Sequence, residues 1–166
     1  MRPISRPLLK WFDKFGRHYL PWQTEQDTPN NTYHVWLSEI MLQQTQVTTV
    51  IDYFNNFIQH FPTLVSLARA SEDSVLAQWA GLGYYSKARN IHTTDNIIMN
   101  QYQGNFTTKF KQIIDLHGVG ESTAGAILSI SFNQNYAILD GNVKRVLSRY
   151  HQVKGHYGQS KTLKEL

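Results

Sequence analysis

The chain has 166 residues, of which 41% are hydrophobic and 13% aromatic, enough to form one packed domain or two small lobes. No apolar run is long enough to cross a bilayer, and no apolar stretch follows the basic N-terminal residues, so we expect a soluble protein without a membrane partner. Cysteine is absent, which excludes disulfides and thiolate-bound metal centres within these residues. The net charge of +4 weakly favours a polyanionic partner.

Apolar residues recur at helical spacing along nearly the whole chain. The first predicted helix carries Leu8, Leu9, Phe12 and Phe15 on one face and ends near Gly16. Ser71 is a predicted N-cap of a later helix. The other predicted helices cover about 32–44, 47–61, 72–80, 86–101, 108–115, 122–132 and 142–150, and 161–166 reads as the start of another. Only Tyr136–Leu139 alternates like a short strand, so the pattern predicts an all-α bundle with short connections.

Two glycines precede the helix predicted at 122–132. In the run Leu116–Ala124, Gly118 and Gly120 allow a tight turn that exposes backbone amides at a helix N-terminus. Such amides, together with the helix dipole, can hold a phosphate without reading base sequence. A plain helix–helix turn is the alternative interpretation.

Two carboxylates stand in contrasting surroundings. Asp140 lies at a predicted helix start, where backbone amides stabilise an anion, and an ordinary N-cap is the alternative role. Glu39 lies in the apolar run Val35–Val47, where burial would hold its proton near neutral pH. The alternative for Glu39 is a surface position on an amphipathic helix.

Together, these segments resemble the helix-hairpin-helix DNA glycosylase superfamily that includes endonuclease III. The run Val35–Val47, with its Gln43–Gln44 pair, resembles the adenine-specific MutY-type branch. The similarity extends from about Leu8 to Leu163, although the family usually has proline at the position of His117. It implies a six-helix barrel module at 25–133, with residues 1–24 and 134–166 belonging to a second helical module.

The resemblance implies a role for each matching residue. Glu39 would be the general acid that protonates the adenine ring, and Asp140 would stabilise positive charge on the sugar, supported by Asn142 and Ser122. The implied adenine pocket comprises Leu20, Trp22, Gln23 and Val47. The implied DNA-binding residues are Gln43, Gln44, Leu82, Tyr84, Lys87, Arg89, Gly118, Val119, Gly120 and Lys144, with Gln44 as the wedge that helps to extrude the base.

Ser122 replaces the lysine nucleophile of endonuclease III-type enzymes, so we expect a monofunctional glycosylase. Lys144 is a phosphate contact in this interpretation, although it lies close enough to Asp140 in sequence to trap the sugar as a side reaction. The expected partner is double-stranded DNA with adenine opposite 8-oxoguanine or guanine. We expect a cytoplasmic monomer, associated with the nucleoid if the source is bacterial.

Family members also carry a [4Fe-4S] cluster on four cysteines and a C-terminal domain that recognises 8-oxoguanine, and neither matches any part of these residues. We therefore expect a fragment in which Leu8 and Phe12 are unusually exposed. Two alternatives remain: a non-catalytic DNA-binding helical module, and an endonuclease III-like bifunctional enzyme, which Ser122 and Glu39 disfavour.

Overall fold

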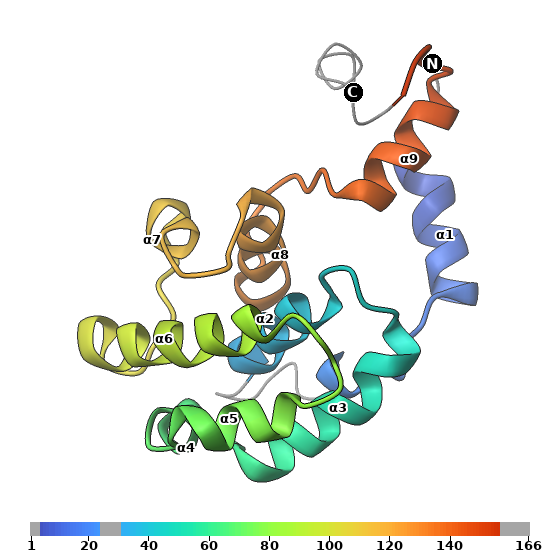
Figure 1. The fold of residues 1–166 in the computed structure, drawn as a ribbon. Coiled ribbons are helices and arrows are strands. Elements are labelled where there is room, and N and C mark those ends of the chain that lie inside the picture. Colours follow the sequence, from blue (N-terminus) through green and yellow to red (C-terminus); the bar gives the residue numbers. More distant parts are fainter. Residues whose placement is uncertain (1–3, 24–30, 157–166) are drawn as a thin grey trace.

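The structure is a computed structural model that describes residues 4–23 and 31–156. Within these ranges it contains helices and connecting segments but no strand (Figure 1). The helices are α1 (Ser5–Phe15), the 3-10 helix η1 (Pro21–Gln23), α2 (Asn31–Leu42), α3 (Val47–His60), α4 (Leu64–Ala68), α5 (Glu72–Trp79), α6 (Tyr85–Tyr102), α7 (Phe110–Ile114), α8 (Glu121–Phe132) and α9 (Gly141–Tyr150). The all-α prediction is confirmed, and Ser71 caps α5 by accepting a hydrogen bond from the Ser74 amide at 3.2 Å.

Helix α2 forms the centre of the bundle and packs against α3, α6, α8 and η1. Its residues Trp36, Leu37 and Met41 are fully buried, because apolar side chains occupy nearly every face of the helix. Tyr33 donates a hydrogen bond from its hydroxyl to the Phe61 carbonyl at 2.8 Å, which ties the start of α2 to the end of α3. These contacts hold α2 in place among its neighbouring helices.

The segment Tyr136–Leu139, whose sequence alternates like a short strand, is a connector without regular secondary structure, in agreement with the all-α prediction. No described segment pairs with it as a neighbouring strand. It lies instead against α8, where Gly125 permits a close approach: a Cβ at Gly125 would stand 3.3 Å from the Ala137 carbonyl oxygen. This contact sets the path of the chain that leads to Asp140.

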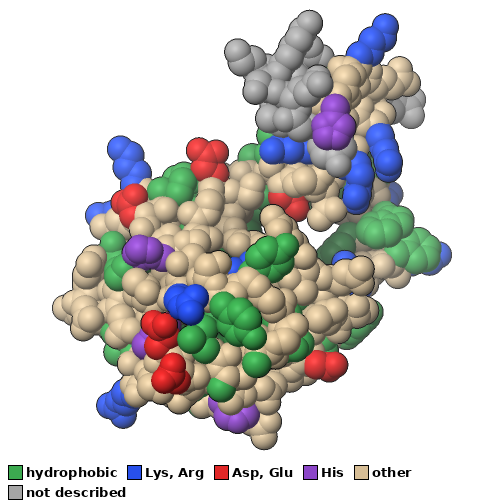
Figure 2. Space-filling model, viewed as in Figure 1, with side chains coloured by type: hydrophobic (Ala, Val, Ile, Leu, Met, Phe, Trp, Pro, Cys, Tyr) green, Lys and Arg blue, Asp and Glu red, His purple; other side chains and the backbone are tan. Residues whose placement is uncertain are grey.

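Helices α1 and α9 lie to one side of the bundle formed by α2–α8 (Figure 1). Leu8 is 49% exposed and Phe12 is 41% exposed, which confirms the predicted exposure of this face. Hydrophobic side chains gather at the position of α1, and lysine and arginine side chains gather around α9 (Figure 2).

Other predictions concern segments without a described structure. The predicted helix at 161–166 lies outside the described residues. The module boundaries near residues 24 and 133 stay a prediction. In the described ranges, the helices are all too short or too polar to cross a membrane.

Candidate active site

A cavity of about 980 Å³ lies between the end of α2, one face of α8 and the beginning of α9. It brings together residues that are more than a hundred positions apart in the sequence, such as Glu39 and Arg145. Of the predicted site residues, Glu39, Gln43, Gln44, Val47, Ser122, Asp140 and Asn142 line it. Glu39, Asp140 and the Gln43–Gln44 pair therefore line the same cavity.

Glu39 projects into this cavity from the buried helix α2, between the buried residues Ser38 and Ile40. Burial and, as the smaller cause, the negative charge of Asp140 together raise the pKa of its carboxyl to about 7. A substantial share of Glu39 is therefore protonated at neutral pH. Such a carboxyl can donate a proton to a basic atom placed in the cavity.

Asp140 is the N-cap of α9, as predicted. Its Oδ1 accepts a hydrogen bond from the Val143 amide at 2.8 Å, and its Oδ2 accepts one from the Asn142 Nδ2 at 3.4 Å. The Asn142 Oδ1 in turn accepts from the Arg145 Nη2 at 3.0 Å. The carboxylate is thus held in one orientation at the positive end of a helix dipole, facing the cavity that also contains Glu39.

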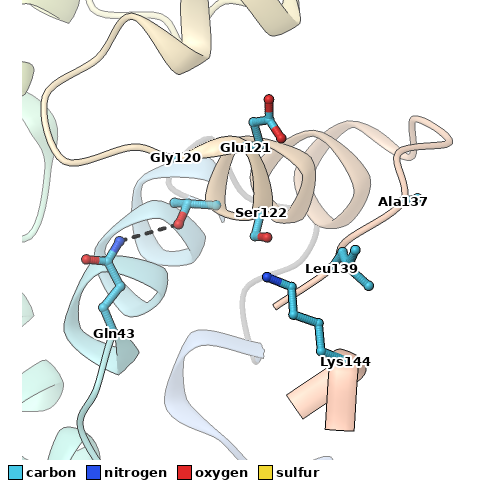
Figure 3. Close-up of a pocket in the computed structure, with 8 residues that line it drawn as sticks. Gln43, Gly120, Glu121, Ser122, Ala137, Leu139 and Lys144 are labelled. Carbon is cyan, nitrogen blue, oxygen red and sulfur yellow. Dashed lines mark hydrogen bonds between the residues drawn. The ribbon is translucent and has the colours of Figure 1, made fainter. Parts of the chain in front are cut away.

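A second cavity, of about 490 Å³, adjoins the first at the N-terminus of α8 (Figure 3). Gln43, Ser122 and Thr123 line both cavities. Lys144 reaches into the second cavity from α9 and points toward Ser122 (Figure 3). An ammonium group and a helix N-terminus thus face the same open space, which suits an anionic ligand.

The two glutamines at the end of α2 lie differently. The Gln43 Nε2 donates to the Gly118 carbonyl at 3.1 Å and to the Thr123 Oγ1 at 3.4 Å, so its side chain is directed at the hairpin (Figure 3). Gln44 is exposed and has a left-handed backbone, with φ at 60°. Gln44 is therefore the better placed of the pair to enter a duplex, in line with the predicted wedge.

The hairpin has the predicted tight turn, but its two glycines serve different purposes. Gly118 has φ at +75° and needs the freedom of glycine, whereas Gly120 has φ at −95° and caps α8. Apart from Gly120 itself and its two neighbours in the chain, no described residue has an atom within 4 Å of the position that a Cβ on Gly120 would take. Val119 buries its side chain and donates its amide to the Leu116 carbonyl at 3.2 Å. Open space at Gly120 leaves room for a ligand to approach the backbone.

The loop before α6 exposes one of its two predicted contact residues. Tyr84 is 58% exposed, with φ at 52°, whereas Leu82 is buried in the core. Leu82 follows the turn that ends α5 and packs inward. This burial argues against the predicted contact with a duplex. Arg89 pairs with Glu72 at 3.3 Å on the surface. Lys87 donates to the Gln43 carbonyl instead of extending into solvent.

Three of the four predicted pocket residues lie away from the large cavity. Leu20 and Trp22 are buried in the core, where the Trp22 ring meets the Phe54 ring edge-on at 5.3 Å. The Gln23 side chain accepts a hydrogen bond from the Leu20 amide at 3.2 Å, which closes the turn at η1. Only Val47 of this group lines the cavity that contains Glu39.

The sequence interpretation missed several residues that line the large cavity. Arg145 is one turn along α9 from Asn142 and lines the cavity beside Asp140, which helical spacing from Asn142 would have indicated. The buried Thr123 anchors Gln43 and carries no recognisable sequence signal. The remaining lining residues outside the prediction are Leu42, Thr45, Ala126, Ile130, Ile138, Gly141 and Val143.

The residues present do not fit the [4Fe-4S] cluster that the resemblance implies, because the chain has no cysteine. Among the described residues, no group of histidines and carboxylates is arranged to hold a metal ion.

Two curated relatives share about half of their aligned residues with this chain. The adenine DNA glycosylase of Buchnera aphidicola subsp. Baizongia pistaciae is 51% identical over 146 residues, covering 88% of this chain and 40% of the relative. That of Buchnera aphidicola subsp. Acyrthosiphon pisum is 49% identical over 163 residues, covering 98% of this chain and 45% of the relative. The chain thus spans less than half the length of these relatives.

The fold and the family follow from two further comparisons. A solved thermostable thymine-DNA glycosylase matches with a TM-score of 0.80 over 93% of this chain and 68% of that chain, at 23% sequence identity. The likeness confirms the predicted glycosylase fold. The model of the HhH-GPD superfamily of base excision DNA repair proteins matches residues 37–166. The chain belongs to this superfamily.

Proposed function

We propose that this chain forms the catalytic lobe of a DNA glycosylase that hydrolyses the N-glycosidic bond of adenine mispaired with 8-oxoguanine or guanine. The observation that carries the proposal is the pairing of Glu39, whose pKa is raised to about 7, with the capped carboxylate of Asp140 across one cavity. Two carboxyl groups in opposed environments are typical of glycosidic hydrolysis. The names of the relatives support adenine as the base.

In the proposed reaction, Glu39 donates its proton to a ring nitrogen of adenine, which makes the base a better leaving group. The bond between the sugar C1′ and the adenine nitrogen then breaks, and its electron pair leaves with the base. Asp140 stabilises the positive charge that develops on the sugar, and Asn142 and the Val143 amide hold Asp140 in place. Water adds its hydroxyl to C1′ and releases a proton, so adenine and an abasic site result.

The same geometry favours a monofunctional enzyme. Ser122 stands on α8 within both cavities, where a lysine would be required to form a Schiff base with the sugar. Lys144 points toward Ser122 and is placed to contact a phosphate of the bound strand. The expected product is an intact strand with an abasic site, which breaks only after treatment with alkali.

The test is single-turnover release of adenine from duplexes with A opposite 8-oxoguanine or G. Glu39→Gln should abolish release while leaving DNA affinity unchanged. Asp52→Asn, which alters an exposed carboxylate on α3, is the matched control and should leave release unchanged. Strand breaks before alkali treatment would contradict the monofunctional mode. No release by the unsubstituted chain, with DNA binding retained, would favour the non-catalytic DNA-binding module.

A further inference from the structure

Lys87 joins two segments that lie far apart in the sequence. From the first turn of α6, its ammonium group donates a hydrogen bond to the main-chain carbonyl of Gln43, at the end of α2. The same group lies over the Tyr84 ring, 5.1 Å from its centroid, in a cation–π contact. One side chain therefore touches both the Gln43–Gln44 turn and the loop that ends at Tyr84.

Both segments carry a backbone conformation that needs support. Gln44 has φ at 60° and Tyr84 has φ at 52°, a region that costs free energy for residues other than glycine. Gln44 follows the end of α2, where this conformation is common, as do Gln103, Asn133 and Gln152 after α6, α8 and α9, whereas Tyr84 directly precedes α6. The side chains of Gln44 and Tyr84 are both exposed.

The network continues from Gln43 to the hairpin. While the Gln43 carbonyl accepts from Lys87, its side-chain amide donates to the Gly118 carbonyl and to the Thr123 Oγ1. Three segments proposed to meet DNA, from α2, the loop before α6 and the hairpin, are thus connected through two side chains. A displacement of one segment strains its link to the others.

We propose that Lys87 is a positioning residue that fixes Gln44 and Tyr84 relative to each other, so that both enter a duplex at defined places. This rests on the proposed function, in which these two side chains face DNA. It differs from the direct DNA contact that the resemblance implies for Lys87, because the ammonium group is directed inward to a carbonyl and a ring. Its partial burial agrees, since desolvation lowers the pKa of Lys87.

A salt titration separates the two roles of Lys87. A phosphate contact contributes about 0.9 to the slope of log affinity against log salt concentration. Lys87→Met removes the ammonium group but retains the length of the stem, and it should leave this slope unchanged. Arg89→Met is the matched control on the exposed face of the same helix, where any phosphate contact would appear as a reduced slope. A slope reduced by about one in Lys87→Met would overturn the proposal.

Positioning is read from base extrusion and from the rate of reaction. A duplex with 2-aminopurine opposite 8-oxoguanine gains fluorescence when the base leaves the stack. Lys87→Met should reduce this gain in fluorescence and slow adenine release about tenfold, because a displaced Gln44 wedge orients the base poorly. The affinity for the duplex should change less than about twofold. Lys87→Arg keeps a donor and a cation over the ring, and should restore most of both signals. Normal extrusion and release in Lys87→Met would overturn the proposal.

A third measurement requires no DNA. Hydrogen exchange of peptides covering 41–46 and 81–86 should accelerate in both Lys87→Met and Lys87→Gln, while exchange in α5 stays unchanged. Unchanged exchange in both segments would contradict the link. If the unsubstituted chain released no adenine, the proposed function alone would be contradicted, since exchange, salt slope and 2-aminopurine fluorescence report on Lys87 independently.

Discussion

Asp95 provides a quantitative test of the packing around α6. The residue is completely buried, and within the described part of the chain neither of its carboxylate oxygens has a hydrogen-bond partner. Burial raises its pKa from the usual 3.8 to about 7. An ionised Asp95 in this place destabilises the folded chain, whereas its protonated form is tolerated.

The sign of the pH dependence follows from proton uptake. Between about pH 4 and pH 7 only the folded state holds a proton on Asp95, so stability falls as the pH rises through this window. Above pH 7 the group is ionised in both states and the loss is complete. One pKa unit is worth about 1.4 kcal/mol, so wild-type stability should fall by on the order of 3 kcal/mol between pH 5 and pH 8 from this group alone.

Asp95→Asn removes the titration while nearly preserving the shape of the side chain. Urea denaturation of both proteins at pH 5 and pH 8 gives the free energy of unfolding in each case. We expect the stability of the variant relative to wild type to be greater at pH 8 than at pH 5, by on the order of 3 kcal/mol. Asp52→Asn on the surface should show no such difference. An equal gap between wild type and Asp95→Asn at both pH values would refute the reasoning.

Three glycine substitutions separate folding from function. Gly125→Val should displace the connector that leads to Asp140 and slow adenine release more than Gly125→Ala does, as measured by single-turnover kinetics. Equal rates for the two variants would contradict the role of the contact between Gly125 and the connector. Gly118→Ala should cost about 1–2 kcal/mol in urea denaturation, because of its positive φ and the Asn90 amide 3.1 Å from the new Cβ. Gly120→Ala should fold normally but bind duplex DNA several-fold more weakly by fluorescence anisotropy, because its Cβ enters the open cavity; undiminished affinity would argue against the hairpin as a DNA contact.

Local patterns in the sequence predicted most of the helices, although not α4, because the signals are local. The Ser71 cap and the Asp140 cap each depend on residues within one helical turn. Glu39 was identifiable because an acid within an apolar run must be buried or must interrupt the core.

The remaining features depend on contacts between distant parts of the chain. The inward direction of Lys87 depends on a carbonyl 44 positions away, and the orientation of Gln43 depends on the hairpin 75 positions away. Leu82 and Tyr84 are close in sequence, but only packing decides that Leu82 is buried and Tyr84 exposed. Periodicity carries no information on such choices. The resemblance implied DNA contacts for Lys87 and Leu82, whereas the structure directs Lys87 to the Gln43 carbonyl and buries Leu82.

The pH profile of single-turnover adenine release tests the central role of Glu39 most directly. Because the pKa of Glu39 is raised to about 7, the rate constant should be constant in mildly acidic solution and fall as the pH rises above 7. The decline should approach about tenfold per pH unit, as the protonated fraction of one acid does. A rate constant that stays level up to pH 9, or one that rises with pH, would contradict Glu39 as the general acid.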